Sequence, residues 1–294
     1  MIKRLTSRSD GRLAIVALVV ALVVIVLIAL TLSKNATREK YENNENVFWT
    51  YWEPENPPSV VKRCYANWKS VGKLQKVIFL NPSNIKTYIP PDELRRIELS
   101  SENSPAHKSD FIALYILKEY GGTFLDGTVF FDRPIQEKNE VWPPKGKFFA
   151  FEATRFSTPN SPCLETFFLH SPKGHPVATT WYNLLHEVGV NKKKFLNWVT
   201  RAYPDINKNM ELDNYLWVYI VGKYMFLKHP ELIGKISTEP VEKGPYLEVH
   251  ENGWNTNFPR VCNALMKRKK IPQRRLLKLF KDLREYCDEK MIPL

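Results

Sequence analysis

The alternation of apolar and polar residues divides the chain into a long apolar run near its start, a short polar stretch and a long mixed part. Residues 13–32, LAIVALVVALVVIVLIALTL, carry no charge. At about 1.5 Å per residue, a helix of this length spans a hydrocarbon core of roughly 30 Å. The apolar region of a cleaved signal peptide is shorter. We therefore expect a transmembrane helix at residues 13–32.

The charge in front of this run predicts its orientation. Residues 1–12 have a net charge of +3, from Lys3, Arg4, Arg8 and Arg12 against Asp10. Positive flanks stay in the cytosol, so residues 1–12 are expected to be a cytosolic tail and the rest of the chain to lie across the membrane. Residues 33–46 are polar and typical of a stem. This arrangement predicts a single-pass type II protein of the Golgi or another secretory-pathway membrane.

The mixed part, residues 47–261, alternates between two apolar patterns and is expected to form one domain. Short β-prone runs predict strands at residues 47–52, 76–80, 123–125, 147–152 and 165–171. Runs with helical spacing predict helices at residues 59–70, 109–120, 176–188 and 210–228, and another that begins at Pro91. Strands that alternate with helices predict an α/β fold, with a mixed, mostly parallel sheet flanked by helices.

The segment 107–134, HKSDFIALYILKEYGGTFLDGTVFFDRP, is the most informative part of the chain. Ser109 is a suitable helix N-cap, and Asp110 suits the positive end of the helix dipole. Gly121 and Gly122 are expected to end the helix, because glycine adopts the positive φ of a helix C-terminus without strain. A short strand then leads to a polar turn, Asp126-Gly127-Thr128. Ligands bind at the carboxyl ends of strands in α/β proteins, so we expect a binding site there.

Composition narrows the class of partner. The chain has a net charge of +12, of which the tail accounts for +3. The remaining charge favours anionic partners such as nucleotide diphosphates, acidic glycans or lipid headgroups. Nucleic acid is not expected on the lumenal side of a membrane. The 8 Trp, 13 Tyr and 16 Phe supply a core and also aromatic surfaces for a base or a sugar.

The four cysteines do not indicate a metal centre. They form no CxxC or Cys/His cluster with zinc spacing. Four cysteines in an oxidising lumen permit two disulfides in one of three pairings, and free thiols are the alternative. The cysteines are Cys64, Cys163, Cys262 and Cys287.

The last segment, residues 262–294, differs from the rest in charge. Between residues 262 and 290 ten basic and four acidic residues give a net charge of +6. A helix starting near Pro272 would place four residues in one apolar stripe: Leu276, Phe280, Leu283 and Cys287. We expect a basic amphipathic helix, which either packs on the domain with a solvated basic face or contacts an anionic membrane or acceptor.

The central segment resembles the sugar-binding region of retaining glycosyltransferases of the capsular polysaccharide synthesis type. That group is similar to the Och1-like mannosyltransferases and to bacterial toxin glucosyltransferases. The shared pattern is Ser-Asp, an apolar helix, Gly-Gly, and Asp-x-Asp or Asp-x-Thr. Two flanks also resemble the capsular branch, namely residues 48–69, FWTYWEPENPPSVVKRCYANWK, and residues 164–176, LETFFLHSPKGHP.

The resemblance implies a GT-A fold, which is a Rossmann-like sheet with an acceptor site beside it. It implies transfer of a sugar from a nucleotide-sugar donor to a glycan or glycolipid acceptor, with retention of configuration. Asp110 and Asp126 are expected to be the catalytic pair, with Asp110 on the sugar hydroxyls and Asp126 on the ribose, the sugar or a metal. The residues expected to bind the donor are Trp49, Tyr51, Ser109, Asp110, Gly122, Asp126, Gly127 and Thr128.

A divalent ion, Mn²⁺ or Mg²⁺, is the cofactor that the resemblance implies, with Asp126, Thr128 and His250 as candidate ligands. His250 has a simpler reading as a surface or core histidine. Two positions depart from the family pattern. Ala113 stands where the family has an arginine, and Thr128 stands where the commoner motif has an aspartate. A hydroxyl is a poorer ligand for these ions than a carboxylate.

The expected chemistry needs positioning more than it needs a nucleophile. In a front-face path the departing phosphate oxygen can take the proton of the acceptor. Glu165 and Glu152 are the carboxylates that could approach the acceptor, and ordinary strand-end carboxylates are the alternative. Ala113 and Thr128 also keep open a catalytically inactive relative that binds a glycan or nucleotide sugar. A third reading is an anchored structural protein that uses its basic C-terminal segment on anionic surfaces.

Overall fold

The structure is a computed structural model, and it describes residues 19–25, 46–102, 104–136, 142–207, 210, 215–251, 253–254 and 275–279. The chain divides into two units, residues 1–43 and residues 44–294. In the first unit, residues 19–25 are helical and exposed. Among the described residues, no helix combines the length and the hydropathy needed to cross a bilayer. Most of the predicted transmembrane helix, residues 13–32, lies outside the described residues, so it stays a prediction.

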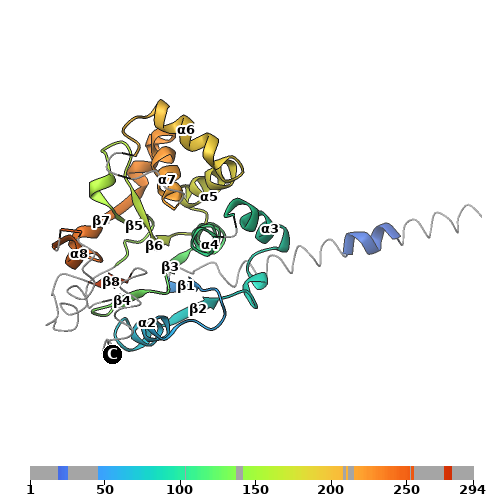
Figure 1. Ribbon diagram of the computed structural model, residues 1–294. Helices are drawn as coiled ribbons and strands as arrows, with labels where there is room; N and C mark the ends of the chain where they lie inside the picture. The colour runs from blue at the N-terminus through green and yellow to red at the C-terminus, as the bar shows by residue number, and fades with distance from the viewer. Residues whose placement is uncertain are drawn as a thin grey trace, which may run out of the picture. The chain divides into compact units, whose positions relative to one another are not determined.

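The second unit is built on a six-stranded sheet in the order β2-β1-β3-β6-β5-β7 (Figure 1). Strand β6 runs antiparallel to both of its neighbours, while the β2-β1-β3 pairs and the β5-β7 pair are parallel. The predicted mixed, mostly parallel sheet is therefore confirmed. The strands are β1 (Val47–Tyr51), β2 (Lys76–Leu80), β3 (Gly122–Leu125), β5 (Phe148–Glu152), β6 (Leu164–Ser171) and β7 (Ile236–Pro240).

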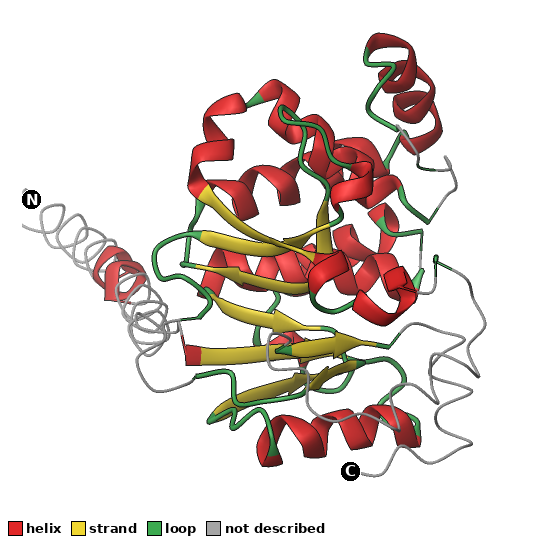
Figure 2. Cartoon of the chain, turned by 90° about the vertical axis from the view of Figure 1, so that its left-hand side faces the viewer, coloured by secondary structure: helices red, strands yellow, loops and turns green. Residues whose placement is uncertain are grey.

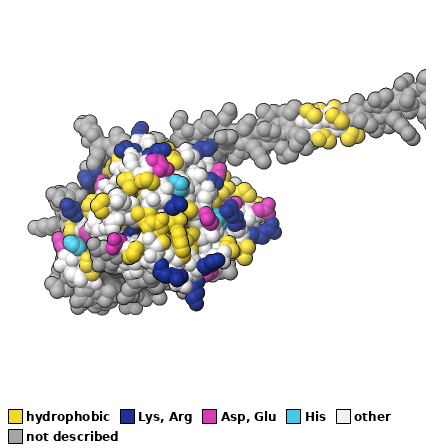
Figure 3. Space-filling model, turned by 90° about the horizontal axis from the view of Figure 1, so that it is seen from above, with side chains coloured by type: hydrophobic (Ala, Val, Ile, Leu, Met, Phe, Trp, Pro, Cys, Tyr) yellow, Lys and Arg dark blue, Asp and Glu magenta, His cyan; other side chains and the backbone are white. Residues whose placement is uncertain are grey.

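Seven helices of the described part surround this sheet. They are α2 (Ser59–Ser70), α3 (Pro91–Ser100), α4 (Pro105–Tyr120), α5 (Pro176–Gly189), α6 (Lys192–Ala202), α7 (Trp217–Lys228) and α8 (Leu247–Glu251). Helices α4 and α5 lie on one side of the strands and α2 lies on the other, as Figures 1 and 2 show. Seen from above in Figure 3, apolar side chains gather near the middle of the exposed face, and Lys and Arg side chains lie mostly at its edges.

Both faces of the sheet are buried, because neighbouring residues of a strand point to opposite faces. In β1, Trp49 packs in the core that α4, α5 and α7 cover, while Phe48 packs in the core that α2 covers. In β5, Ala150 packs in the core under α4, α5 and α7, and Phe151 packs in the core under α2. This double burial explains why β1 and β5 are almost wholly apolar rather than alternating.

Helix α4 carries the central segment and corrects one sequence prediction. Ser104 and Pro105 stand at its start, so the predicted N-cap role of Ser109 is wrong and Ser109 lies inside the helix. Proline fits the first helical position because that position needs no N–H partner. The predicted stop is confirmed, since Gly121 has a φ of +70°. A Cβ at this position would lie 2.7 Å from the backbone nitrogen of Lys173, so only glycine fits.

The predicted helix from Leu276 onward is also wrong at its start. Leu276–Lys278 form strand β8, which pairs antiparallel with β4 (Val129–Phe131) in a separate two-stranded sheet. Leu276, Leu277 and Leu279 are all buried. Burial of three nearly consecutive leucines favours a strand enclosed on both faces over an amphipathic surface helix. Phe280, Leu283 and Cys287 lie outside the described residues.

Helix α2 holds β4 in place through side chains that bind its backbone. The Asn67 amide donates to the carbonyl of Phe131 (3.0 Å), and its oxygen accepts from the N–H of the same residue (2.6 Å). The Trp68 indole donates to the carbonyl of Val129 (2.6 Å). Asn67 and Trp68 are both buried. These three bonds fix the β4-β8 sheet against α2.

We predict that Asn67→Ala lowers the free energy of unfolding by about 3 kcal/mol, because both polar groups of Phe131 would then be buried without partners. Urea unfolding of the full chain measures this value. The control is Lys62→Ala, an exposed change on the same helix. Equal stability of the two variants would show that Asn67 does not hold β4.

Candidate functional site

A cavity of about 580 Å³ lies at the carboxyl edge of the parallel strands. It collects residues from the ends of β1 and β3, from the start of the antiparallel strand β6, and from the first two turns of α4. Helix α7 and strand β8 complete its wall. This is the place where the topology of an α/β sheet predicts a ligand.

The turn after β3 is held by its own side chains. The Asp126 Oδ1 atom accepts hydrogen bonds from the backbone N–H (2.9 Å) and the hydroxyl (2.7 Å) of Thr128. Between them, a Cβ on Gly127 would lie 2.8 Å from the ring of Trp52, so the close approach of Trp52 requires glycine. Asp126 therefore points one oxygen at the turn and keeps the other for a further partner.

That partner is Lys278, which reaches the turn from strand β8. Its Nζ atom lies 2.8 Å from Asp126 Oδ2 and donates to the Thr128 hydroxyl oxygen at 2.5 Å. The register places Lys278 opposite Val129, directly beyond the turn. The Lys278 side chain is only 11% exposed, although it lines the cavity. Burial by itself would raise the pKa of Asp126, but the Lys278 ammonium and the Thr128 hydrogen bonds outweigh it and hold that pKa below its usual range.

Asp110, Glu165 and Glu53 are the other carboxyls on the cavity wall. Burial raises the pKa of Asp110 to about 7, and the negative charge of Asp126 contributes in the same direction. Burial also raises the pKa of Glu165 to about 7, against a hydrogen bond that Tyr219 donates to its Oε2 (3.2 Å). The hydrogen bond from Tyr51 lowers the pKa of Glu53. The cavity therefore combines two carboxylates of lowered pKa, Asp126 and Glu53, with two carboxyls that titrate near neutrality.

Arg155 adds a second cation to the cavity. It belongs to a short 3₁₀ turn, Thr154–Phe156, that follows β5. Its guanidinium carbon lies 3.8 Å from the ring centroid of Trp254 and 4.2 Å from that of Phe156. Cation–π contacts of this kind fix the plane of a guanidinium group. Aromatic rings line the rest of the cavity, including Tyr51, Trp52, Phe124, Phe167, Tyr215 and Tyr246.

The structure brings several predicted site residues to this cavity: Tyr51, Ser109, Asp110 and Asp126, with Glu165 from the acceptor candidates. The Tyr51 hydroxyl donates a hydrogen bond to Glu53 Oε2 (2.6 Å), and Glu53 also lines the cavity. Thr128 is fully buried behind Asp126 and acts on it rather than facing the cavity.

Other predicted residues lie elsewhere. Trp49 is fully buried in the core and donates its indole N–H to the carbonyl of Gly121 at 2.9 Å. Gly122 is buried within β3. Glu152 does not line the cavity and accepts a hydrogen bond from Thr238 (2.9 Å). Ala113 is fully buried within α4, at a position surrounded by the core.

The predicted metal ligands are not assembled. His250 is exposed on α8, where its ring lies 5.8 Å from that of Trp254, and it does not line the cavity. Within the described part of the chain, no three His, Cys, Asp or Glu side chains cluster as metal ligands do. The oxygens of Asp126 and Thr128 that would face a cation are bound to Lys278. This donor set does not fit a divalent ion. Cys64 and Cys163 are buried, and the other two cysteines lie outside the described residues.

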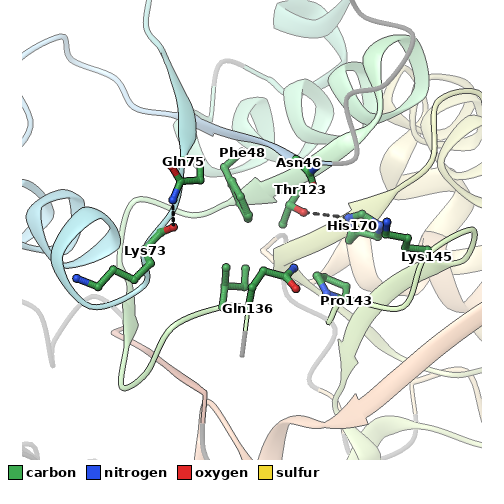
Figure 4. Close-up of a pocket in the computed structure, with 10 residues that line it drawn as sticks. Asn46, Phe48, Lys73, Gln75, Thr123, Gln136, Pro143, Lys145 and His170 are labelled. Atoms are coloured by element: carbon green, nitrogen blue, oxygen red, sulfur yellow. Dashed lines mark hydrogen bonds between the residues drawn. The ribbon is translucent and has the colours of Figure 1, made fainter. Parts of the chain in front are cut away.

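A second cavity of about 310 Å³ lies at the opposite, amino edge of the strands (Figure 4). It includes Phe48 and Thr123, whose hydroxyl lies 2.9 Å from Nδ1 of His170. Burial lowers the pKa of His170 to about 4, so its ring is neutral at physiological pH. None of the predicted site residues lies here, and the chemistry gathers at the carboxyl edge.

Sequence reasoning missed Lys278, Arg155 and Tyr219 as members of the site. Lys278 was counted within the basic C-terminal segment, and nothing in its neighbourhood distinguishes it from the nine other basic residues there. Arg155 and Tyr219 belong to no motif of the chain. Only the three-dimensional arrangement brings them beside Asp126 and Glu165.

Comparison with known proteins assigns the family. The profile of the family described as capsular polysaccharide synthesis protein matches residues 28–203, which is more than half of the chain. The protein therefore belongs to this family, as the central segment and its flanks predicted.

Individual relatives are distant. The O-glycosyltransferase PaGT of Phomopsis amygdali is 26% identical over 157 residues, which are 49% of this chain and 39% of that protein. The match thus spans about two fifths of that relative's length. Two solved structures are also similar. The PaToxG glycosyltransferase has 14% identity, a TM-score of 0.39, and coverage of 70% of this chain and 87% of that one. The apo form of the glycosyltransferase GlyE from Streptococcus pneumoniae TIGR4 has 10% identity, a TM-score of 0.37, and coverage of 84% and 60%.

The raised pKa of Glu165 predicts that the free energy of unfolding depends on pH. A carboxyl whose pKa rises from 4.5 to about 7 on folding binds its proton more tightly in the folded chain. Stability from this group is therefore full below about pH 4.5 and falls as the pH rises to about 7. Glu165→Gln removes this loss and keeps an acceptor for Tyr219. We expect the variant to gain on the order of 2 to 3 kcal/mol relative to the native chain between pH 4 and pH 8.

Urea unfolding of both chains at a series of pH values measures this difference. The matched control is Glu251→Gln, at an exposed position outside the cavity. The charged groups that act on Glu165 include Lys278, Glu242, Arg155 and Asp110, and they stay in place in the variant. If the free energy of unfolding of Glu165→Gln changed with pH in parallel with that of the native chain, the raised pKa of Glu165 would be contradicted.

Proposed function

We propose that this protein is a glycosyltransferase that moves a sugar from a nucleotide-diphosphate donor to a glycan or lipid-linked acceptor, with retention of configuration. The observation that carries the proposal is the convergence of Asp110, Asp126 and Lys278 on one aromatic-lined cavity at the carboxyl edge of the sheet. Membership of the capsular polysaccharide synthesis family and the relative named as an O-glycosyltransferase support the same class of reaction.

The cavity offers a suitable surface for each part of such a donor. The aromatic side chains stack on a base or on a sugar ring, which both have flat apolar faces. Lys278 and Arg155 supply positive charge for a diphosphate. Asp110 faces the sugar hydroxyls. Because its pKa is about 7, it can accept hydrogen bonds when ionised and donate one when protonated.

The reaction needs little covalent chemistry from the protein. The bond between the anomeric carbon and the β-phosphate oxygen breaks, and its electron pair leaves with the nucleoside diphosphate. The acceptor hydroxyl oxygen forms the new bond to the anomeric carbon, and its proton passes to the departing phosphate oxygen. Cationic side chains that meet the developing negative charge provide the main catalytic effect. Glu165, held by Tyr219, orients the acceptor hydroxyl.

The test is an assay of the full chain for release of UDP or GDP from a panel of nucleotide sugars. We expect turnover with at least one donor. Asp110→Asn should lower kcat/KM about 100-fold or more, because the sugar loses a charged partner. The control is Asp92→Asn, an exposed aspartate on α3 that does not line the cavity. Donor binding without turnover for every donor would favour the inactive relative instead.

We also propose that residues 13–32 anchor the chain in a Golgi or other secretory-pathway membrane, with the domain that begins at residue 47 in the lumen. The support is the uncharged apolar run with its basic flank. A C-terminal tag on the expressed chain should be protected from protease in sealed microsomes and become sensitive when detergent is added. Cleavage without detergent would contradict this topology.

A further inference from the structure

We propose that the Lys278 ammonium takes the place of a divalent metal ion at Asp126, so that this protein binds the diphosphate of its donor without a metal. The inference rests on the proposed function, because it names how the same cavity recognises a nucleoside diphosphate. It starts from the disagreement between the expected ligands, Asp126, Thr128 and His250, and their observed surroundings.

The first support is that both oxygens of the Asp126 carboxylate already have partners within the protein. Oδ1 accepts two hydrogen bonds from Thr128, and Oδ2 lies 2.8 Å from Lys278 Nζ. The hydroxyl of Thr128 donates to Asp126 and accepts from Lys278, so it has one lone pair left. A metal ion at Asp126 Oδ2 would either displace Nζ or lie beside it. In both cases it would face an ammonium group at close range, and this like-charge contact is unfavourable.

The second support is the way in which the fold delivers Lys278. Its strand is anchored by the buried side chains of Leu277 and Leu279 on either side of it. The N–H of Leu279 donates to the carbonyl of Thr128 at 3.0 Å, which ties the strand to the same turn that Nζ binds. Lys278 is therefore a fixed part of the site, in contrast to a solvated surface lysine. An ammonium held in advance loses little freedom when a ligand arrives.

The third support is that the Lys278 ammonium group can still donate one more hydrogen bond. An ammonium group has three N–H donors, and the described residues provide acceptors for two of them, Asp126 and Thr128. Lys278 lines the cavity, so the third N–H is left for a ligand there. A phosphate oxygen is the natural acceptor, because hydrogen bonds between charged groups are about twice as strong as neutral ones. Arg155 lines the same cavity and adds a second positive charge for the diphosphate.

The role in the reaction follows from this placement. When the bond between the anomeric carbon and the β-phosphate oxygen breaks, the electron pair stays on the nucleoside diphosphate. Lys278 stabilises that charge through its third N–H. The acceptor hydroxyl forms the new bond and gives its proton to the departing phosphate oxygen, so the ammonium keeps all of its protons throughout.

The test measures binding and metal separately from turnover. UDP and GDP are titrated calorimetrically into the full chain in EDTA and again in Mn²⁺, and Mn²⁺ alone is titrated and followed by electron paramagnetic resonance. We expect one diphosphate to bind with the same Kd in EDTA and in Mn²⁺, and Mn²⁺ alone to give no bound signal. Lys278→Met should weaken that binding in EDTA by about 10- to 100-fold. Lys193→Met, an exposed lysine on α6, should bind like the native chain.

The native chain alone decides the main question, even if Lys278→Met folds poorly. Binding of a diphosphate only in Mn²⁺ overturns the inference and leaves the proposed function intact. Lys278→Met that folds and binds the diphosphate like the native chain also overturns it. No binding of either diphosphate under both conditions, together with no turnover, removes the proposed function and the inference with it. Recovery of binding by Lys278→Met on addition of Mn²⁺ would support the inference, since the metal would then occupy the place of the ammonium.

Discussion

The contact between Lys278 and Asp126 ties the end of the described chain to the turn that follows β3. Lys278 is only 11% exposed, and a charge removed from water to this extent needs partners for its polar groups. Thr128 satisfies this condition, because its backbone N–H and its hydroxyl bind Asp126 while its oxygen receives Lys278. The geometry of the turn, the position of β8 and the charge of the cavity wall all depend on this group of three residues.

The position of β8 depends in turn on helix α2. Lys278 reaches Asp126 because β8 pairs with β4, and β4 is held by Asn67 and Trp68 through its own backbone. A helix near the start of the domain thus fixes a strand near its end. The aromatic core around Trp142 and Phe168 fills the space between these elements and the main sheet. This explains why Asn67 and Trp68, whose side chains bind backbone groups of β4, are buried among apolar residues.

The cavity separates its carboxyl groups into two kinds. Asp126 keeps its charge, because Lys278 and Thr128 lower its pKa against the effect of burial. Asp110 and Glu165 lack an equal partner, and burial raises their pKa values to about 7. One wall of the cavity is therefore a neutral ion pair, and the others can switch between accepting and donating hydrogen bonds. Such a division suits a ligand that carries both phosphate and sugar hydroxyls. The phosphate meets the ammonium of the ion pair, and the hydroxyls meet carboxyls that can accept or donate a hydrogen bond.

Much of the fold followed from local patterns. The strands of residues 76–80 and 165–171, the helix stop at Gly121 and the polar turn at Asp126 depend on neighbours in sequence, and the structure contains them. Trp49 shows the limit of such reasoning. Its place in the opening strand of the resemblance suggested a donor contact, but Trp49 lies in the middle of β1 and is fully buried in the core. Tyr51 lies on the same face of the strand, and it reaches the cavity because it stands at the carboxyl end. Which residues of one face reach the cavity depends on how far along the strand the covering helices extend, and the sequence pattern of a doubly buried strand does not record this.

Lys278 marks a deeper limit, because its role depends on a contact across 150 residues. The helical stripe read from Leu276 was a reasonable local pattern, but pairing with β4 overrides local preference. The charges nevertheless point to a reason for the arrangement. Two carboxylates with a divalent ion carry no net charge, and one carboxylate with one ammonium carries none either. Thr128 in place of an aspartate removes one negative charge, so the matching positive group need carry only one charge. A lysine side chain meets that requirement from within the chain, and the turn then keeps its electrostatic balance at every metal concentration.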